Sequence, residues 1–126
     1  MAKKKKILLI EDDPDQQKMY LFAFEKAGHR LLQATNGKDG VATAHKEKPD
    51  VILLDMLMNG IDGIETLKLL RKDEVVDDTI PVVIFTNFTK DELLDQARSL
   101  GASEVIIKTE MVPHDLVRHI EETYLR

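Results

Sequence analysis

The stretch that decides the fold is Val51-Ile52-Leu53-Leu54-Asp55, four apolar residues that end in a carboxylate. Three further apolar stretches also end in polar groups: Ile7-Leu8-Leu9-Ile10 before Glu11-Asp12-Asp13, Val82-Val83-Ile84-Phe85 before Thr86, and Val105-Ile106-Ile107 before Lys108. Short apolar runs, largely β-branched, are typical of parallel strands buried on both faces. Ligands of an open α/β sheet bind outside the carboxyl ends of its strands. We therefore predict that these polar groups converge on one site.

Segments with helical periodicity separate the apolar runs. The expected helices start at Pro14, Asn36-Gly37, after Asp62-Gly63, at Thr89 and at Val112-Pro113, with Asp13–Gln16 and Thr89–Glu92 as capping boxes. A shorter strand is expected over residues 30–34. Five strands alternating with five helices predict an α/β fold, a doubly wound (βα)5 three-layer sandwich with parallel strand order 2-1-3-4-5. This order places Glu11 and Asp12 beside Asp55.

Length and composition narrow the class of protein. The chain has 126 residues, and we expect one domain over 1–126 with no output domain. The lack of cysteine excludes disulfides, thiolate metal sites and cysteine nucleophiles. Only four apolar residues follow the basic Lys3–Lys6 stretch, so no signal peptide or membrane segment is expected, and the cytoplasm is the expected location. The net charge of −5 argues against nucleic acid as a direct partner.

The predicted site combines three carboxylates with one ammonium. Carboxylates this close repel one another, and a hard divalent cation offsets that repulsion. Magnesium prefers oxygen ligands and typically takes one or two carboxylates plus a phosphate oxygen. Lys108 adds a positive charge for a phosphoryl oxygen, and Thr86 offers a hydroxyl donor. These groups suit phosphoryl transfer to an aspartate. As a strand-end ammonium, Lys108 is expected to contribute little to the core.

The chain resembles the receiver domains of two-component response regulators, which have the flavodoxin-like fold, over essentially its whole length. The matching residues are Leu9-Ile10-Glu11-Asp12-Asp13, Leu53-Leu54-Asp55-Met56-Leu57-Met58, Gly60-Ile61-Asp62-Gly63, Thr86, Gly101-Ala102 and Lys108. Each motif alone is a weak signal. Their order, and their positions at the ends of the expected strands, make the combination specific.

The resemblance implies a role for each site residue. Asp55 would be the phosphoacceptor, Lys108 would pair with the phosphoryl group, and Thr86 would move to hydrogen-bond it. Magnesium would be bound by Asp12, Asp55 and the backbone carbonyl of Leu57, and by Glu11 mostly through water.

The resemblance also implies partners. A histidine kinase or a histidine phosphotransfer protein would donate the phosphoryl group, and an unknown downstream protein would receive the signal through a protein–protein surface. The chain would be a monomer or a weak homodimer. It would catalyse only its own magnesium-dependent phosphorylation and slow dephosphorylation, and so would not be an enzyme in the usual sense.

Four positions depart from the family pattern, and one of them is Asn87, which is larger than the small residue that the family usually has after the residue matched by Thr86. Asn59 and Thr109 stand where the family usually has proline. Val105 stands where the family has an aromatic residue that swings inward on phosphorylation. The resemblance therefore implies a changed coupling between the site and the surface formed by the fourth helix, fifth strand and fifth helix.

Three other functions compete with a phosphorylation switch. The first is an interaction module that is no longer phosphorylated and dephosphorylated. The presence of all five site residues argues against it: Glu11, Asp12, Asp55, Thr86 and Lys108. A flavodoxin-like electron carrier needs a phosphate-cradling loop after the first strand, where Glu11-Asp12-Asp13 would repel phosphate. A phosphatase of the haloacid dehalogenase type needs a second aspartate two residues after Asp55, where Leu57 stands.

Overall fold

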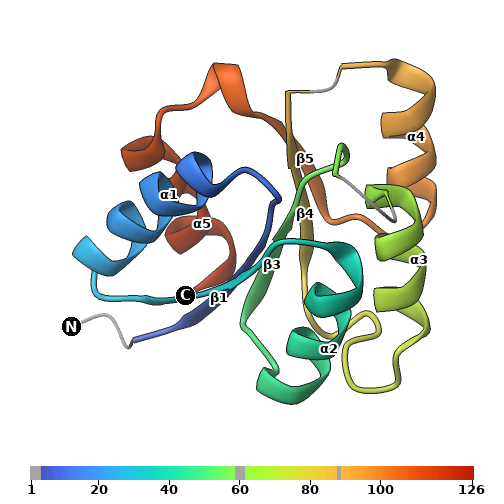
Figure 1. Cartoon of the computed structure of the whole chain (residues 1–126), viewed down its shortest axis with the longest axis horizontal. Helices are drawn as coiled ribbons and strands as arrows, with labels where there is room; N and C mark the ends of the chain where they lie inside the picture. The colour runs from blue at the N-terminus through green and yellow to red at the C-terminus, as the bar shows by residue number, and fades with distance from the viewer. Residues whose placement is uncertain (1–3, 59–61, 88) are drawn as a thin grey trace.

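A five-stranded parallel sheet forms the centre of the molecule (Figure 1), seen in a computed structural model that describes residues 4–58, 62–87 and 89–126. The strands are β1 (Lys6–Ile10), β2 (Arg30–Ala34), β3 (Val51–Leu54), β4 (Val82–Thr86) and β5 (Glu104–Ile107). They lie in the order β2-β1-β3-β4-β5, and all their pairings are parallel. The predicted doubly wound α/β fold and its strand order are confirmed.

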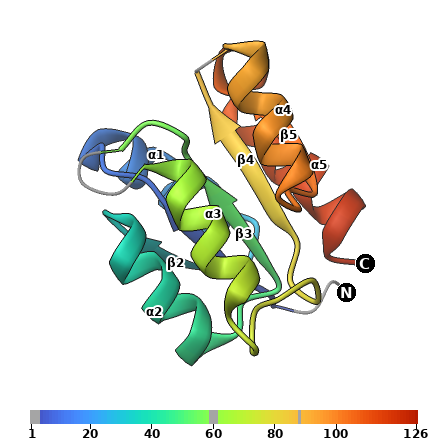
Figure 2. The ribbon, with the colours of Figure 1, turned by 90° about the vertical axis from the view of Figure 1, so that its right-hand side faces the viewer.

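Helices cover both faces of the sheet. They are α1 (Pro14–Lys26), α2 (Gly37–Glu47), α3 (Gly63–Lys72), α4 (Asp91–Ser99) and α5 (Pro113–Tyr124), and a short 3-10 turn spans Lys108–Glu110. Helices α1 and α5 lie on one face, while α2, α3 and α4 lie on the other (Figures 1 and 2). In the part of the chain that the structure describes, no helix is long and apolar enough to cross a membrane.

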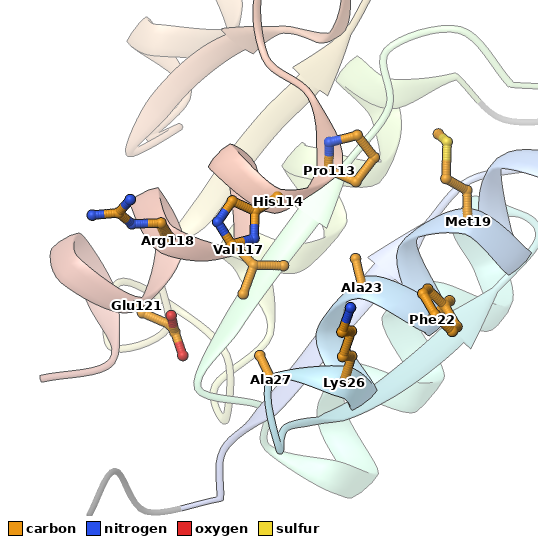
Figure 3. A pocket seen from close by; sticks show the side chains of 10 residues that line it. All are labelled: Met19, Phe22, Ala23, Lys26, Ala27, Pro113, His114, Val117, Arg118 and Glu121. Carbon is orange, nitrogen blue, oxygen red and sulfur yellow. The ribbon is translucent and has the colours of Figure 1, made fainter.

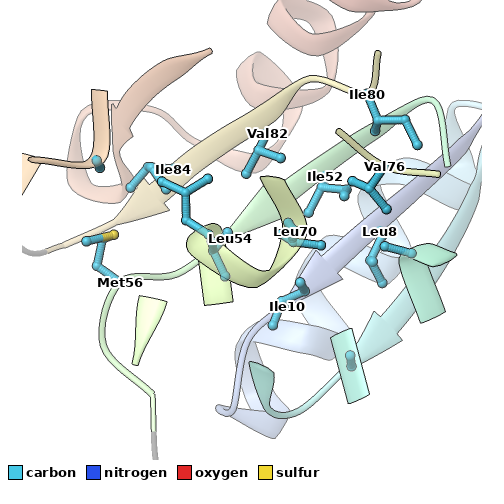
Figure 4. Packing of buried hydrophobic residues seen from close by; sticks show 14 of the residues in the cluster. Leu8, Ile10, Ile52, Leu54, Met56, Leu70, Val76, Ile80, Val82 and Ile84 are labelled. Atoms are coloured by element: carbon cyan, nitrogen blue, oxygen red, sulfur yellow. The ribbon is translucent and has the colours of Figure 1, made fainter. Parts of the chain in front are cut away.

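Alternate residues of each strand enter the two halves of the core. On β1, Leu8 and Ile10 pack towards α2 and α3, while Ile7 and Leu9 pack towards α1 and α5. All four are at most 1% exposed, because helices shield both faces of the sheet. Figure 4 shows the first of these halves, in which residues of β1, β3 and β4 meet Leu70 of α3. This rigid sheet fixes the positions of the residues that follow each strand.

The predicted capping box at Thr89–Glu92 is wrong, and the one at Asp13–Gln16 forms only in its first half, in which Asp13 caps α1. Its side chain accepts hydrogen bonds from the backbone N–H groups of Asp15 and Gln16, at 2.8 and 3.3 Å. The backbone N–H of Asp13 donates to Glu11 Oε1 at 3.1 Å, which takes the place of a reciprocal bond to Gln16. Helix α4 starts at Asp91, so the residue at its cap is Lys90, which makes no side-chain cap bond. Lysine has no acceptor for this purpose.

Candidate functional site

The ends of two neighbouring strands bring two carboxylates together. Ile10 of β1 and Leu54 of β3 are partners in the sheet, so Glu11 and Asp55 follow side by side. The backbone N–H of Asp55 donates to the carbonyl of Ile10 at 3.1 Å, which continues the ladder past the last strand pair. Glu11 is only 2% exposed and Asp55 only 7%. The structure therefore confirms the predicted proximity of these two acids.

Lys108 joins both carboxylates. Its Nζ donates to Asp55 Oδ2 at 3.1 Å, to Gln16 Oε1 at 2.5 Å, and to Glu11 Oε2 in a close contact. The ammonium also lies 5.5 Å from the ring centroid of Phe85, within the range of a cation–π interaction. Lys108 is buried, and its contribution to stability stays a prediction, now a larger one than a strand-end ammonium alone suggests. Its ammonium forms ion pairs with Glu11 after β1 and Asp55 after β3, and a hydrogen bond with Gln16 of α1.

The electrostatics of the site favour an added positive charge. Burial raises the pKa of Glu11 to about 7; Lys108 opposes this shift, and the nearby Asp55 carboxylate adds to it. Burial also raises the pKa of Tyr20 to about 12, and the charges of Glu11 and Asp55 act in the same direction. Two buried carboxylates thus share one ammonium. A cation entering the site would relieve their repulsion.

The other predicted site residues lie beside this cluster. Asp12 follows Glu11 and is half-buried. Thr86 is fully buried at the end of β4, where it pairs in register with Ile107 of β5. The backbone N–H of Leu57 donates to Asp55 Oδ1 at 3.2 Å, and its side chain is 55% exposed. The matches at Gly60 and Ile61 and the departure at Asn59 lie outside the described residues.

Two glutamines of α1 lie near the site, and the sequence did not single out either as functional: Gln16 contacts Lys108, while Gln17 donates to backbone carbonyl groups. Gln16 reaches Lys108 from the first turn of α1. Gln17 is buried, and its Nε2 donates to the carbonyl oxygens of Glu11 and Ala34 at 2.8 and 3.0 Å. Gln17 therefore ties α1 to the ends of β1 and β2. The only sequence signal for either residue was its position in the first turn after the acidic cluster.

Gly63, the first residue of α3, packs against the backbone of Asp55 and Met56. A Cβ placed on Gly63 would lie 2.5 Å from Met56 Cα and 2.7 Å from the carbonyl oxygen of Asp55. The backbone N–H of Gly63 donates to the carbonyl of Met56 at 3.1 Å. Glycine is required here because no side chain fits between α3 and this loop.

Gly63→Ala is therefore expected to destabilise the domain by about 2 kcal/mol, as overpacking of a close contact does. It should also displace the loop that holds Asp55. Urea unfolding would measure the first effect, and amide chemical shifts of Asp55 and Met56 the second. Gly40→Ala is the matched control, because the three atoms nearest to its Cβ would all belong to the side chain of Ile10 and none to the backbone. Equal shift changes at Asp55 in both variants would contradict the role given to Gly63.

The donor set suits a hard divalent cation. Over residues 4–58, 62–87 and 89–126, no three acidic or histidine side chains form a metal-binding group by themselves. Magnesium does not need such a group, because it keeps several waters and takes one or two carboxylates plus substrate phosphate oxygens. Carboxylates of Asp12, Asp55 and Glu11 and the carbonyl of Leu57 are all oxygen donors of the type that it prefers.

A groove of about 490 Å3 lies between α1 and α5, away from these carboxylates (Figure 3). Its wall is mostly apolar, from Met19 and Phe22 on α1 to Pro113 and Val117 on α5, and Phe22 is 68% exposed. None of the predicted site residues lines it. The carboxylate cluster therefore remains the candidate site.

Comparison with known proteins agrees with this geometry. The family described as response regulator receiver domain matches residues 7–121. Protein PilH of Pseudomonas aeruginosa is 40% identical over 105 residues, which cover 82% of this chain and 84% of that protein. Sporulation initiation phosphotransferase F of Bacillus subtilis is 36% identical over 97 residues, which cover 77% of this chain and 76% of that protein.

Solved structures show the same fold. The chemotaxis protein CheY4 of Vibrio cholerae superposes with a TM-score of 0.86 at 25% sequence identity. The alignment covers 95% of this chain and 98% of that chain. The same fold thus occurs in a related protein of nearly the same extent.

Proposed function

Because the chain belongs to the response regulator receiver domains of two-component signalling, we propose that Asp55 accepts a phosphoryl group from a histidine kinase or a histidine phosphotransfer protein. One observation supports this assignment above the others. Asp55 lies at the end of a central strand with one carboxylate oxygen bound by the Leu57 N–H and the other by the Lys108 ammonium. The family match sets aside the electron carrier and the phosphatase as alternatives.

The geometry suits nucleophilic attack by the Asp55 carboxylate on phosphorus. The bond between phosphorus and the donor nitrogen breaks as the bond between phosphorus and the aspartate oxygen forms, and the nitrogen leaves with the electron pair. Lys108 already contacts Asp55, so its ammonium needs only a small shift to meet a phosphoryl oxygen. Thr86 ends the neighbouring strand and offers its hydroxyl to a second phosphoryl oxygen.

Magnesium is the proposed cofactor. Asp12, Asp55 and the carbonyl of Leu57 would hold it, with Glu11 mostly acting through water. When bound, the ion neutralises charge on the transferring phosphoryl group. It would also offset the repulsion between the carboxylates around Lys108.

Asp12→Asn is expected to weaken magnesium binding at least tenfold, because the substitution removes one anionic ligand from a site that supplies few. Titration of the unphosphorylated protein with magnesium, followed by amide chemical shifts of Glu11 and Leu57, would measure the change. Asp15→Asn is a suitable control, since Asp15 is an exposed acid in the first turn of α1. A titration unchanged by Asp12→Asn would remove Asp12 from the metal site.

Phosphorylation by a small donor tests the proposed function. Acetyl phosphate with magnesium should add one phosphoryl group, which intact-mass spectrometry would detect. The adduct should be lost on treatment with hydroxylamine, which cleaves acyl phosphates. Absence of any adduct, with the domain folded, would instead favour an interaction module that does not cycle phosphate.

The output of the switch is proposed to leave through a protein–protein surface to a downstream protein in the cytoplasm, without direct binding of nucleic acid or membrane. The chain would act as a monomer or weak homodimer. Val105 is half-buried and packs against the core cluster on the α2–α4 face. The short side chain of valine cannot make the inward movement of an aromatic ring. On phosphorylation, the surroundings of Val105 should therefore stay nearly fixed while the loop after Thr86 changes conformation.

A further inference from the structure

We infer that Gln16 is a positioning residue for phosphoryl transfer, because its side-chain oxygen orients the Lys108 ammonium towards Asp55. The inference rests on the proposed function. Gln16 Oε1 accepts from Lys108 Nζ at 2.5 Å, across 92 residues of sequence. The start of the helix that carries Gln16 does not use this bond, since Asp13 caps α1 through backbone N–H groups.

The ammonium has three N–H donors, and three acceptors surround it. Glu11, Gln16 and Asp55 each accept one hydrogen bond. With two donors directed to Glu11 and Gln16, the third points at Asp55. When Asp55 carries a phosphoryl group, that third donor can pass to a phosphoryl oxygen while the other two bonds remain. Gln16 thus restricts where the ammonium lies both before and after transfer.

The amide suits this position better than a carboxylate would. Glu11 and Asp55 already place two acidic groups around one ammonium, and the incoming phosphoryl group brings further negative charge. A neutral oxygen accepts the third hydrogen bond without adding to that charge. Hydrogen bonds to charged groups are stronger than those between neutral groups, so this contact can hold the lysine side chain in one arrangement.

Gln17 provides a matched control. It is the same residue type at the next position, and its Nε2 binds the backbone carbonyls of Glu11 and Ala34. A second glutamine, Gln33, donates to the Gln17 side chain at 2.9 Å. Gln17 therefore holds α1 to the sheet through backbone groups. Its loss should lower stability, whereas loss of Gln16 should act on Lys108.

The test compares Gln16→Leu and Gln17→Leu with the unsubstituted chain by two measurements. The first is the rate of phosphorylation by acetyl phosphate with magnesium, at a temperature where all three proteins are folded. The second is the NMR signal of the Lys108 ammonium in unphosphorylated protein without magnesium. Gln16→Leu should slow phosphorylation about tenfold, the factor that corresponds to about 1.4 kcal/mol, and should shift or broaden the ammonium signal. Gln17→Leu should lower the unfolding midpoint and leave both readouts nearly unchanged.

The two measurements separate this inference from the proposed function. If the unsubstituted chain gains no phosphoryl group, the proposed function fails, and the inference fails with it even if the ammonium signal shows that Gln16 holds Lys108. If the chain is phosphorylated and Gln16→Leu reacts at the same rate, the inference alone is overturned. It is also overturned if Gln17→Leu slows the reaction as much as Gln16→Leu does.

Discussion

Asp55→Asn is expected to abolish phosphorylation of the chain by acetyl phosphate. The amide has nearly the shape of the carboxylate but lacks the charged oxygen that attacks phosphorus. The domain should stay folded, because the amide oxygen can still accept from Leu57 or Lys108. The pKa of Glu11 should fall, since the Asp55 carboxylate is one cause of its elevation. Intact mass after incubation with acetyl phosphate and magnesium would measure the loss.

Asp50→Asn is the control for this substitution. Asp50 accepts a hydrogen bond from the backbone N–H of Lys6 at 2.9 Å, at the end of the sheet opposite the candidate site. This variant should still take up one phosphoryl group. A phosphoryl group that persists on another residue of the Asp55→Asn variant would show that the nucleophile is wrongly assigned.

The position of the acidic cluster could be predicted from the sequence because it follows from regular structure. Four apolar runs of strand length, separated by helical segments, leave few parallel topologies. Once β1 and β3 are neighbours, register alone brings Glu11 next to Asp55. This prediction needs only the backbone register and no side-chain conformation. For the same reason, Thr86 and Lys108 were also placed correctly, at the carboxyl ends of β4 and β5.

The contacts inside the site could not be predicted in this way. The local sequence predicted that the Gln16 side chain would complete a capping box with Asp13. Its side-chain oxygen instead accepts from the charged ammonium of Lys108, 92 positions away. Lys108 was expected only as a strand-end ammonium that contributes little to the core, but it is buried among groups from α1 and from the ends of β1 and β3. Similarly, Gly63 was expected only to precede a helix, although it allows a close approach between α3 and the loop after β3. The contacts of these three residues depend on tertiary packing, which a local sequence pattern does not predict.

The second large effect is expected for Lys108→Met, which keeps the length of the side chain and removes its charge. Phosphorylation should fall at least a hundredfold, because no cation remains on the protein to meet the phosphoryl oxygen at Asp55. The domain should also lose about 3 kcal/mol of stability above pH 7, the range seen when one partner of a buried ion pair is removed. Glu11 and Asp55 would then be buried side by side without the ammonium that they share.

The dependence of this loss on pH distinguishes charge from packing. Burial already raises the pKa of Glu11 from an ordinary value of 4.5 to about 7, and Lys108 opposes that shift, so Lys108→Met should raise it further. A carboxyl group with a raised pKa in the folded state costs nothing below its unfolded pKa, and the cost grows as pH rises towards the folded value. Between pH 4.5 and 7 this cost is the same in both proteins, because Glu11 is protonated in both folded states. The difference in unfolding free energy that Glu11 causes should therefore be small below pH 7 and increase above it, up to the higher pKa of Glu11 in the variant. Adding Glu11→Gln to Lys108→Met should restore part of the stability above pH 7 and flatten this dependence. A loss of equal size at every pH would instead mean that Lys108 stabilises the domain through its aliphatic chain, and that the buried carboxylates do not depend on its charge.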